Sequence, residues 1–142
     1  MSRRLFSLAV VSMLFTGCSD SIGNVPDSFL GCDRVEGYRL GDADGGNLST
    51  SDCGLSGSYI DYYAFTLSSD RDIVIDLSSN QFDAYLILFD RRTGDVIEEN
   101  DDGPFDTDAR IAGFLESGDY IIGVTSFDPG ETGQYTLDSD TN

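Results

Sequence analysis

Beyond residue 30 the apolar residues occur in short runs separated by Gly, Asp, Ser and Asn. No helical period persists for three turns, whereas several runs alternate apolar and polar positions as half-buried strands do. The pattern predicts eight strands, at residues 35–40, 59–67, 72–77, 84–90, 95–99, 109–115, 119–126 and 134–137. About eight strands over this length predict an all-β fold, an antiparallel β-sandwich of jelly-roll type.

Alternation also assigns side chains to the core, because residues two positions apart lie on the same face of a strand. The predicted core residues are Tyr63, Phe65 and Leu67, then Ile73, Ile75 and Leu77, and then Tyr120, Ile122 and Val124. Residues 84–89 are apolar almost without interruption, which predicts a central strand covered on both faces. Residues 91–95 follow it with the composition of a hairpin turn.

The first 17 residues have the pattern of an export signal rather than of a fold element. Two arginines precede an uncharged run at 5–15, which is too short to span a bilayer because spanning takes about 20 apolar residues. The small residues before Cys18 resemble a bacterial lipobox, although Phe15 stands where leucine is usual. We therefore expect cleavage before Cys18 and a lipid on that cysteine. The alternative is an ordinary signal peptide followed by an incidental cysteine.

Residues 18–30 are polar, contain Gly23 and Pro26, and show no apolar period, which indicates a flexible tether. Residues 31–142 then form a single domain of ordinary size. Ser19, rather than aspartate, follows the cysteine, so we expect the lipid to anchor the exported chain to the cell envelope at the outer membrane.

The sequence has three cysteines, one next to the export signal and two in the predicted domain. If Cys18 carries the lipid, Cys32 and Cys53 remain as a pair in a compartment where disulfides persist. Closing a loop of about 20 residues would stabilise the fold by roughly 3 kcal/mol through the unfolded state. The alternatives are two free thiols or a pair of metal ligands.

The chain is strongly acidic, with 26 Asp and Glu residues, no histidine, no lysine and a formal net charge of −18. Cleavage of the signal removes Arg3 and Arg4, so that six arginines remain and the charge becomes −20. Nucleic acids and anionic lipid surfaces are therefore poor partners, and we expect no nucleic-acid binding. The acidity is consistent with a salt-rich habitat, and calcium binding explains part of it equally well.

The composition also limits catalysis. Without histidine and lysine the usual general bases and amine nucleophiles are missing, so triad-type hydrolysis is excluded. A pair of carboxylates can still catalyse glycoside hydrolysis, but the acids here lie in turns and no tryptophan offers a platform for a sugar. We expect a protein that is not an enzyme.

The densest acidic segment is a candidate calcium loop, since hard cations prefer clustered oxygen ligands. Its candidate ligands are Asn100, Asp101, Asp102, Asp106 and Asp108. The alternative is a turn without metal in which these side chains cap local backbone amides. A second segment, residues 42–47, has some of the spacing of an EF-hand loop but lacks its distal glutamate, and we interpret it as a solvated turn.

The order of several segments resembles the bacterial pre-peptidase C-terminal domain family, which is related to the collagen-binding domains of clostridial collagenases. The segments are 62–67, 82–90, 99–102, 108–111, 118–124 and 130–137, so the resemblance covers about residues 35–137. It implies a jelly-roll sandwich of the kind that accompanies exported enzymes, and some members bind calcium, collagen or polysaccharide.

On this resemblance Asp83 and residues 100–102 correspond to acidic positions of the family, and Arg110 and Tyr120 to structural ones. We expect this domain to stand alone, without a peptidase before it. Collagen-binding members use exposed aromatic residues; Tyr85 points outward if Leu86 and Leu88 point inward, but partial burial between strands is the simpler reading, and we do not carry collagen binding over.

These observations predict a non-catalytic, lipid-anchored binding or scaffolding module at the cell envelope, attached to the membrane through the lipid at Cys18. Its ligand would be a protein or polysaccharide met by the acidic loops around Asp102 and Asp128, and the charge favours a basic partner. The alternative is a chaperone or inhibitor-like partner of a separately encoded secreted peptidase. A carboxylate enzyme would need two acids that face each other across a pocket.

Overall fold

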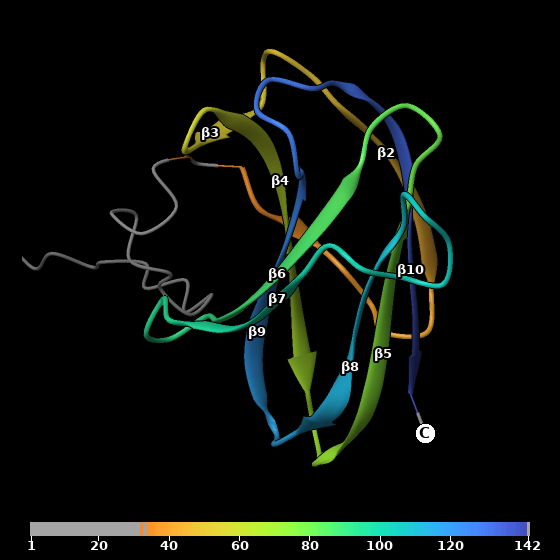
Figure 1. Ribbon diagram of the computed structural model, residues 1–142. Helices are drawn as coiled ribbons and strands as arrows, with labels where there is room; N and C mark the ends of the chain where they lie inside the picture. The colour runs from red at the N-terminus through yellow and green to blue at the C-terminus, as the bar shows by residue number, and fades with distance from the viewer. Residues whose placement is uncertain (1–31, 33, 142) are drawn as a thin grey trace, which may run out of the picture.

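The computed structural model describes Cys32 and residues 34–141, which form two facing β-sheets (Figure 1). The strands are β1 (Glu36–Gly37), β2 (Ala43–Leu48), β3 (Cys53–Leu55), β4 (Ser58–Leu67), β5 (Arg71–Ser78), β6 (Ala84–Asp90), β7 (Val96–Asn100), β8 (Ala109–Leu115), β9 (Gly118–Ser126) and β10 (Gly133–Thr141). Within these residues no helix has the length and apolar character needed to cross a bilayer. The predicted signal peptide at 1–17, the tether at 18–30 and the lipidated Cys18 lie outside the described residues.

The strand order is that of a jelly roll. Sheet A has the order β1-β4-β9-β6-β7, with β3 also paired to β4, and sheet B has the order β2-β10-β5-β8. All pairs are antiparallel except the short parallel pair of β1 and β4. The predicted antiparallel sandwich of jelly-roll type is confirmed. It has ten strands rather than the predicted eight, because β2 and β3 are added: β2 consists of small and polar residues without alternation, and β3 has only three residues.

The main core lies between the two sheets. All nine residues that alternation assigned to it are buried there, and Ile75, Leu77, Ile122 and Val124 have no exposed surface. Each such side chain stabilises the fold by roughly 1.5–3 kcal/mol relative to an exposed position. The period-2 pattern of β4, β5 and β9 therefore determines which faces of the two sheets meet.

Sheet A is apolar on its outer face as well. A second cluster of buried residues there contains Cys53, Ile60, Tyr62, Ile87, Phe89 and Ile121. Strand β6 contributes Leu86 and Leu88 to the main core and Ile87 and Phe89 to the outer cluster, which confirms the prediction of a strand covered on both faces. Gly123 leaves room for this packing: a Cβ there would lie 2.9 Å from Cδ1 of Ile60.

Two stretches differ from the prediction. The interpretation of residues 42–47 as a solvated turn is wrong, because residues 43–48 form β2 at the edge of sheet B, paired to β10 from Gly133↔Leu48 to Asp138↔Ala43. The chain turns earlier, where the amide of Asp42 donates to the carbonyl of Arg39. The predicted strand at 35–40 is reduced to the two residues of β1. Both are edge segments, so few of their side chains are buried and their sequences carry little alternation.

The predicted disulfide joins Cys32 to Cys53, with 5.7 Å between their Cα atoms. Cys53 begins β3 and is buried in the outer cluster of sheet A, against which Cys32 packs. The bond therefore attaches the start of the described chain to this edge of the sandwich.

Candidate functional site

Three loops at one end of the sandwich are held in fixed positions relative to one another. They are residues 79–83 between β5 and β6, 101–108 between β7 and β8, and 127–132 between β9 and β10. The amide of Ala84 donates to the carbonyl of Thr107 at 3.0 Å, and the amide of Phe127 donates to the carbonyl of Asp83 at 2.9 Å. The hydroxyl of Thr107 donates to the carbonyl of Ser79.

The predicted calcium loop is organised by the side chain of Asn100. Its amide nitrogen donates to the carbonyls of Asp102 and Arg110 at 3.0 and 2.9 Å, and its oxygen accepts from the amide of Asp102. The side chain of Asn100 therefore caps the backbone of the loop. The alternative interpretation of this segment, a turn without metal, predicted such capping. In the part of the chain that the structure describes, no three acidic or cysteine side chains form a group that could hold a metal. Calcium binding by Asn100, Asp101, Asp102, Asp106 and Asp108 stays a prediction.

The loops do bring acidic residues together around Asp83. Burial raises the pKa of the Asp83 carboxyl, and the charges of Asp101, Asp128 and Asp102 raise it further. All three neighbours have the same sign as Asp83, so this end of the molecule has a concentrated negative potential. The sequence pointed to each of these loops separately, and the fold places them side by side. Burial and the charge of Asp76 also raise the pKa of Asp108.

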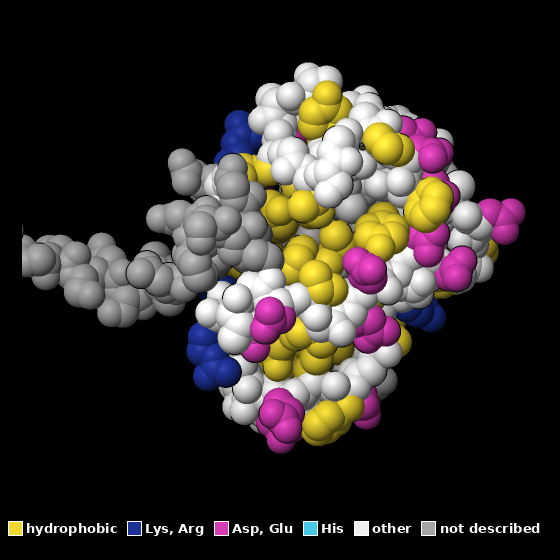
Figure 2. Space-filling model, turned by 60° about the vertical axis from the view of Figure 1, so that its left-hand side comes forward, with side chains coloured by type: hydrophobic (Ala, Val, Ile, Leu, Met, Phe, Trp, Pro, Cys, Tyr) yellow, Lys and Arg dark blue, Asp and Glu magenta, His cyan; other side chains and the backbone are white. Residues whose placement is uncertain are grey.

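Beside this acidic end lies an open, partly apolar groove of about 370 Å³, which we call the aromatic groove. It is lined by Leu55, Ser56, Ser58, Tyr85, Ile87, Glu99, Thr125, Ser126, Phe127 and Pro129. Figure 2 shows the side of the molecule on which β3, β7 and β9 lie in Figure 1. There, apolar side chains gather in the centre, and acidic ones lie along the right-hand border and over the lower half of the face.

Two aromatic rings, Tyr85 and Phe127, dominate the groove. Their centroids are 6.3 Å apart with the planes tilted by 49°, and Phe127 is 54% exposed. Tyr85 is half-buried on the outer face of sheet A while Leu86 and Leu88 point into the core, as the sequence predicted. Burial raises the pKa of the Tyr85 hydroxyl, and the nearby carboxylates of Glu99 and Asp101 raise it further.

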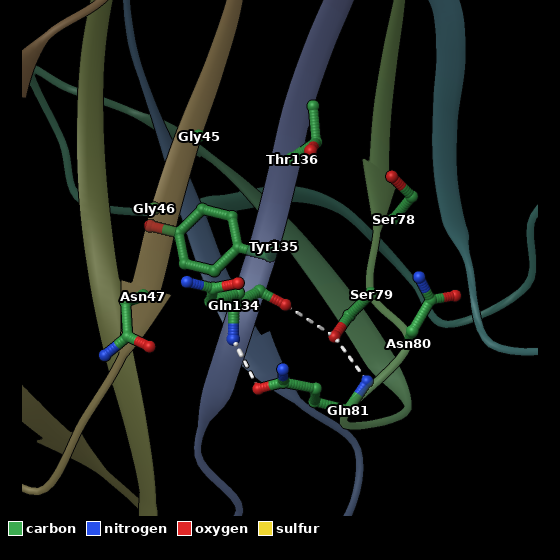
Figure 3. A pocket seen from close by; sticks show the side chains of 10 residues that line it. All are labelled: Gly45, Gly46, Asn47, Ser78, Ser79, Asn80, Gln81, Gln134, Tyr135 and Thr136. Carbon is green, nitrogen blue, oxygen red and sulfur yellow. Dashed lines mark hydrogen bonds between the residues drawn. The ribbon is translucent and has the colours of Figure 1, made fainter.

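A second, more polar pocket of about 670 Å³ lies over β2 and β10 (Figure 3). Asn47 and Asn80 lie on opposite sides of it, and at its base the amide of Gln134 donates to Oε1 of Gln81 at 2.9 Å. None of the residues that line it is charged, so it offers hydrogen bonds but no acid or base. Sequence reasoning missed this pocket because β2 was interpreted as a turn.

A buried chain of hydroxyls crosses the sandwich below this pocket. The hydroxyls of Tyr63 and Tyr135 are 2.6 Å apart, and Tyr135 donates to the Asp61 carboxylate at 2.6 Å. Burial raises the pKa of Tyr63 to about 12 and raises that of Tyr135 still further. Burial also raises the pKa of Asp61, against the opposing effect of its hydrogen bond from Tyr135. The three groups satisfy one another's hydrogen bonds within the core.

Arg110 and Tyr120 have structural positions, as the family resemblance implied. Arg110 makes a two-point contact with Asp76 on the neighbouring strand, at 2.6 and 2.8 Å. The ring of Tyr120 stacks on Phe65, and its hydroxyl donates to the carbonyl of Glu116.

A carboxylate enzyme would need two acids that face each other in a pocket, one of them desolvated. Glu98 and Asp102 line a shallow depression together with Arg110, and both acids are exposed to solvent. Glu98 and Asp102 are therefore solvated surface carboxylates, and neither is desolvated as the acid of such a pair would be.

The sequence matches no protein-family model and no curated protein. Among solved structures, the chain is similar to the pre-peptidase C-terminal domain of collagenase from Bacillus anthracis, with a TM-score of 0.62 and 17% identity over 77% of this chain and 97% of that domain. It is also similar to Aeromonas hydrophila PliG, a periplasmic lysozyme inhibitor of g-type lysozyme, with a TM-score of 0.53 and 14% identity over 77% of this chain and 96% of that one. At these identities the likeness is one of fold. The chain has the β-sandwich fold of the pre-peptidase C-terminal domain, which the resemblance of its sequence predicted.

Proposed function

We propose that this protein is a non-catalytic binding module presented at the cell envelope. The observation that supports this most directly is the aromatic groove, where Phe127 is 54% exposed beside Tyr85. Exposed aromatic side chains in a concave, rigid setting are typical of sites that bind a partner. The absence of histidine and lysine from the whole sequence supports a role without catalysis.

Placement at the envelope rests on the cysteines. The disulfide of Cys32 and Cys53 is of the kind that persists in exported proteins. Cys18 follows an apolar run that resembles a lipoprotein signal, and a lipid there would anchor the chain, with outer-membrane residence favoured by Ser19. Cys18→Ala should release soluble precursor on fractionation; a variant that stayed in the membrane fraction with unchanged processing would show that the lipid anchor is wrong.

The binding role can be tested with a photo-cross-linker in the lipidated full chain. Phe127 replaced by p-benzoylphenylalanine should give an adduct of defined mass on illumination of intact cells. The same replacement at Phe114, which is 62% exposed on β8 of sheet B, is the matched control. Absence of an adduct from position 127, or the same adducts from both positions, would contradict the proposal.

A second candidate function is that of an inhibitor-like partner of an exported hydrolase. It is favoured by the fold shared with PliG, which is a periplasmic lysozyme inhibitor, and by the fold shared with a domain of a collagenase. Titration of the protein against a panel of g-type lysozymes and secreted peptidases tests it. Loss of hydrolysis that saturates at one-to-one stoichiometry would establish inhibition, and binding without loss of hydrolysis would favour the scaffolding role.

Calcium at residues 100–108 would need the loop to rearrange, because Asn100 is engaged with the backbone. Thermal melting in calcium chloride and in sodium chloride at matched ionic strength decides the point. A rise in Tm that is specific to calcium and is abolished by Asp102→Ala would establish the site. Equal Tm values would leave the loop as a solvated turn.

A further inference from the structure

The aromatic groove combines an apolar surface with a single charge. Of the ten residues that line it, Glu99 alone carries a charge, and Leu55, Tyr85, Ile87, Phe127 and Pro129 supply the apolar surface. Glu99 is exposed on the edge strand β7, so its carboxylate can also accept hydrogen bonds from an incoming group. A ligand that matches this lining has a flat or extended apolar part that ends in a donor with positive charge.

The aromatic rings suit the same kind of ligand. The face of an aromatic ring attracts a cation that lies within about 6 Å of its centre, and guanidinium groups stack on such faces more often than ammonium groups do. Phe127 presents more than half of its surface to solvent, and Tyr85 lies 6.3 Å from it, centroid to centroid. An arginine side chain could therefore place its methylene stem and guanidinium plane against the rings and its N–H groups toward Glu99.

The surroundings of the groove are acidic. Asp101 acts electrostatically on both Tyr85 in the groove and Asp83 beside it, which places the acidic end next to the aromatic rings. Asp128 lies between Phe127 and Pro129, both of which line the groove. A negative rim around an apolar site raises the local concentration of cationic ligands and their association rate.

Resting on the proposed binding function, we propose that the aromatic groove is a docking site for an arginine side chain on the basic surface of a protein partner. Tyr85 and Phe127 hold the guanidinium plane, Glu99 accepts its hydrogen bonds, and the acidic loops orient the partner's remaining positive charge. The polar pocket over β2 and β10 differs because its lining has no charged group, and we assign it no role in this contact.

A peptide probe tests the ligand class separately from the identity of the partner. The full chain is titrated with a short peptide that carries two arginines in a Gly-Ser background, and with the same peptide in which citrulline replaces both arginines. Citrulline keeps the shape and removes the charge. We expect saturable NMR shifts confined to residues 55–58, Tyr85, Glu99 and Phe127 with the arginine peptide, and at least tenfold weaker binding of the citrulline peptide.

Matched variants then locate the contact. Glu99→Gln and Phe127→Ala should each weaken binding of the arginine peptide at least fivefold. Glu98→Gln removes the same charge from the adjacent position of β7, and Phe114→Ala removes an exposed ring from sheet B; both should change binding less than twofold. Unchanged amide spectra outside the groove would show that the variants remain folded.

Three results would overturn the proposal. Equal binding of both peptides would identify a site for neutral ligands, and saturation by a chito-oligosaccharide without arginine binding would identify a sugar site. Shifts spread over the acidic surface, with equal effects of Glu98→Gln and Glu99→Gln, would indicate general electrostatic attraction. Each of these outcomes leaves the cross-linking test of the binding function unaffected, so the two proposals can fail separately.

Discussion

Gly46 lies directly beneath the ring of Tyr135, and the space it leaves allows that ring to pack. A Cβ at Gly46 would lie 2.2 Å from Cζ of Tyr135, whereas one at the neighbouring Gly45 would meet only the carbonyl oxygen of Tyr135, at 3.9 Å. Gly46→Ala should therefore displace the ring and lower the free energy of unfolding by about 1–3 kcal/mol. Urea denaturation measures the loss.

Gly45→Ala is the matched control for this variant, because it makes the same chemical change one position away on the same edge strand. We expect it to change stability by less than about 0.5 kcal/mol. Equal losses in the two variants would show that the conformation of β2, and not the ring of Tyr135, requires glycine.

Asp61 accepts the last hydrogen bond in the chain of buried hydroxyls, and its titration makes the stability of the fold depend on pH. Burial raises its pKa in the folded state, so its contribution to stability is fully present below the unfolded pKa and is lost as pH rises through the folded pKa. Asp61→Asn removes the charge and keeps an acceptor for Tyr135. It should raise Tm by a few degrees at pH 7 and leave it unchanged at pH 3.

The control for Asp61 is Asp72→Asn, which removes the same charge from an exposed position on β5. It separates the desolvation of Asp61 from the general relief of a highly negative surface. The interpretation is contradicted if the two variants gain equally at pH 7, or if Asp61→Asn gains as much at pH 3.

At the scale of elements, the strands that could be predicted are those with one face in the core. Tyr63, Phe65 and Leu67 alternate with more polar neighbours because β4 packs against sheet B, and the pattern records that packing. Strand β2 buries Leu48 and otherwise consists of small or polar residues. Its sequence therefore shows no alternation of apolar and polar positions from which its pairing with β10 could be predicted.

The same reasoning explains how much of the site could be predicted. The acidic loops were visible because each is a continuous stretch of sequence, as residues 100–108 are. The aromatic groove was not visible, since the fold assembles it from Leu55, Tyr85, Glu99 and Phe127, which are far apart along the chain. Phe127 had one local signal, an aromatic residue in a loop rich in Asp, Pro and Gly, where an apolar side chain has little to pack against.

The turn between β3 and β4 borders the groove and requires left-handed backbone. Ser56 and Gly57 have φ values of 52° and 95°, as in a type I′ hairpin turn. Gly57→Ala should lower the free energy of unfolding by about 1–2 kcal/mol through backbone strain alone, since its Cβ would meet nothing nearer than Pro129 at 3.9 Å.

Gly54→Ala, in β3 with open space around it, should have little effect in the same denaturation assay. Similar losses in both would exclude strain as the cause.

At the scale of the whole molecule, charge is distributed unevenly over a regular sandwich. Within the described residues two ion pairs form, Arg34 with Asp52 and Arg110 with Asp76, and most acidic side chains described there have no ion-pair partner. Self-repulsion of this surface opposes the compact state of the domain. The acidic loops around Asp83 concentrate the repulsion at the end of the molecule that we propose binds a basic partner.

Salt should therefore stabilise the protein by screening. The Debye length falls from about 10 Å at 0.1 M to about 3 Å at 1 M, which is shorter than most distances between surface charges. We expect Tm to rise by several degrees across this range of sodium chloride and to rise less in Asp83→Asn, because that variant removes the centre of the acidic group. Asp72→Asn, with the same change in net charge, should keep nearly the full salt dependence. Two results would contradict this: a Tm that does not change with salt, or equal slopes of Tm against salt concentration for Asp83→Asn and Asp72→Asn. Either would mean that the repulsion is not concentrated at these loops. The electrostatic part of the docking proposal would then lose its basis.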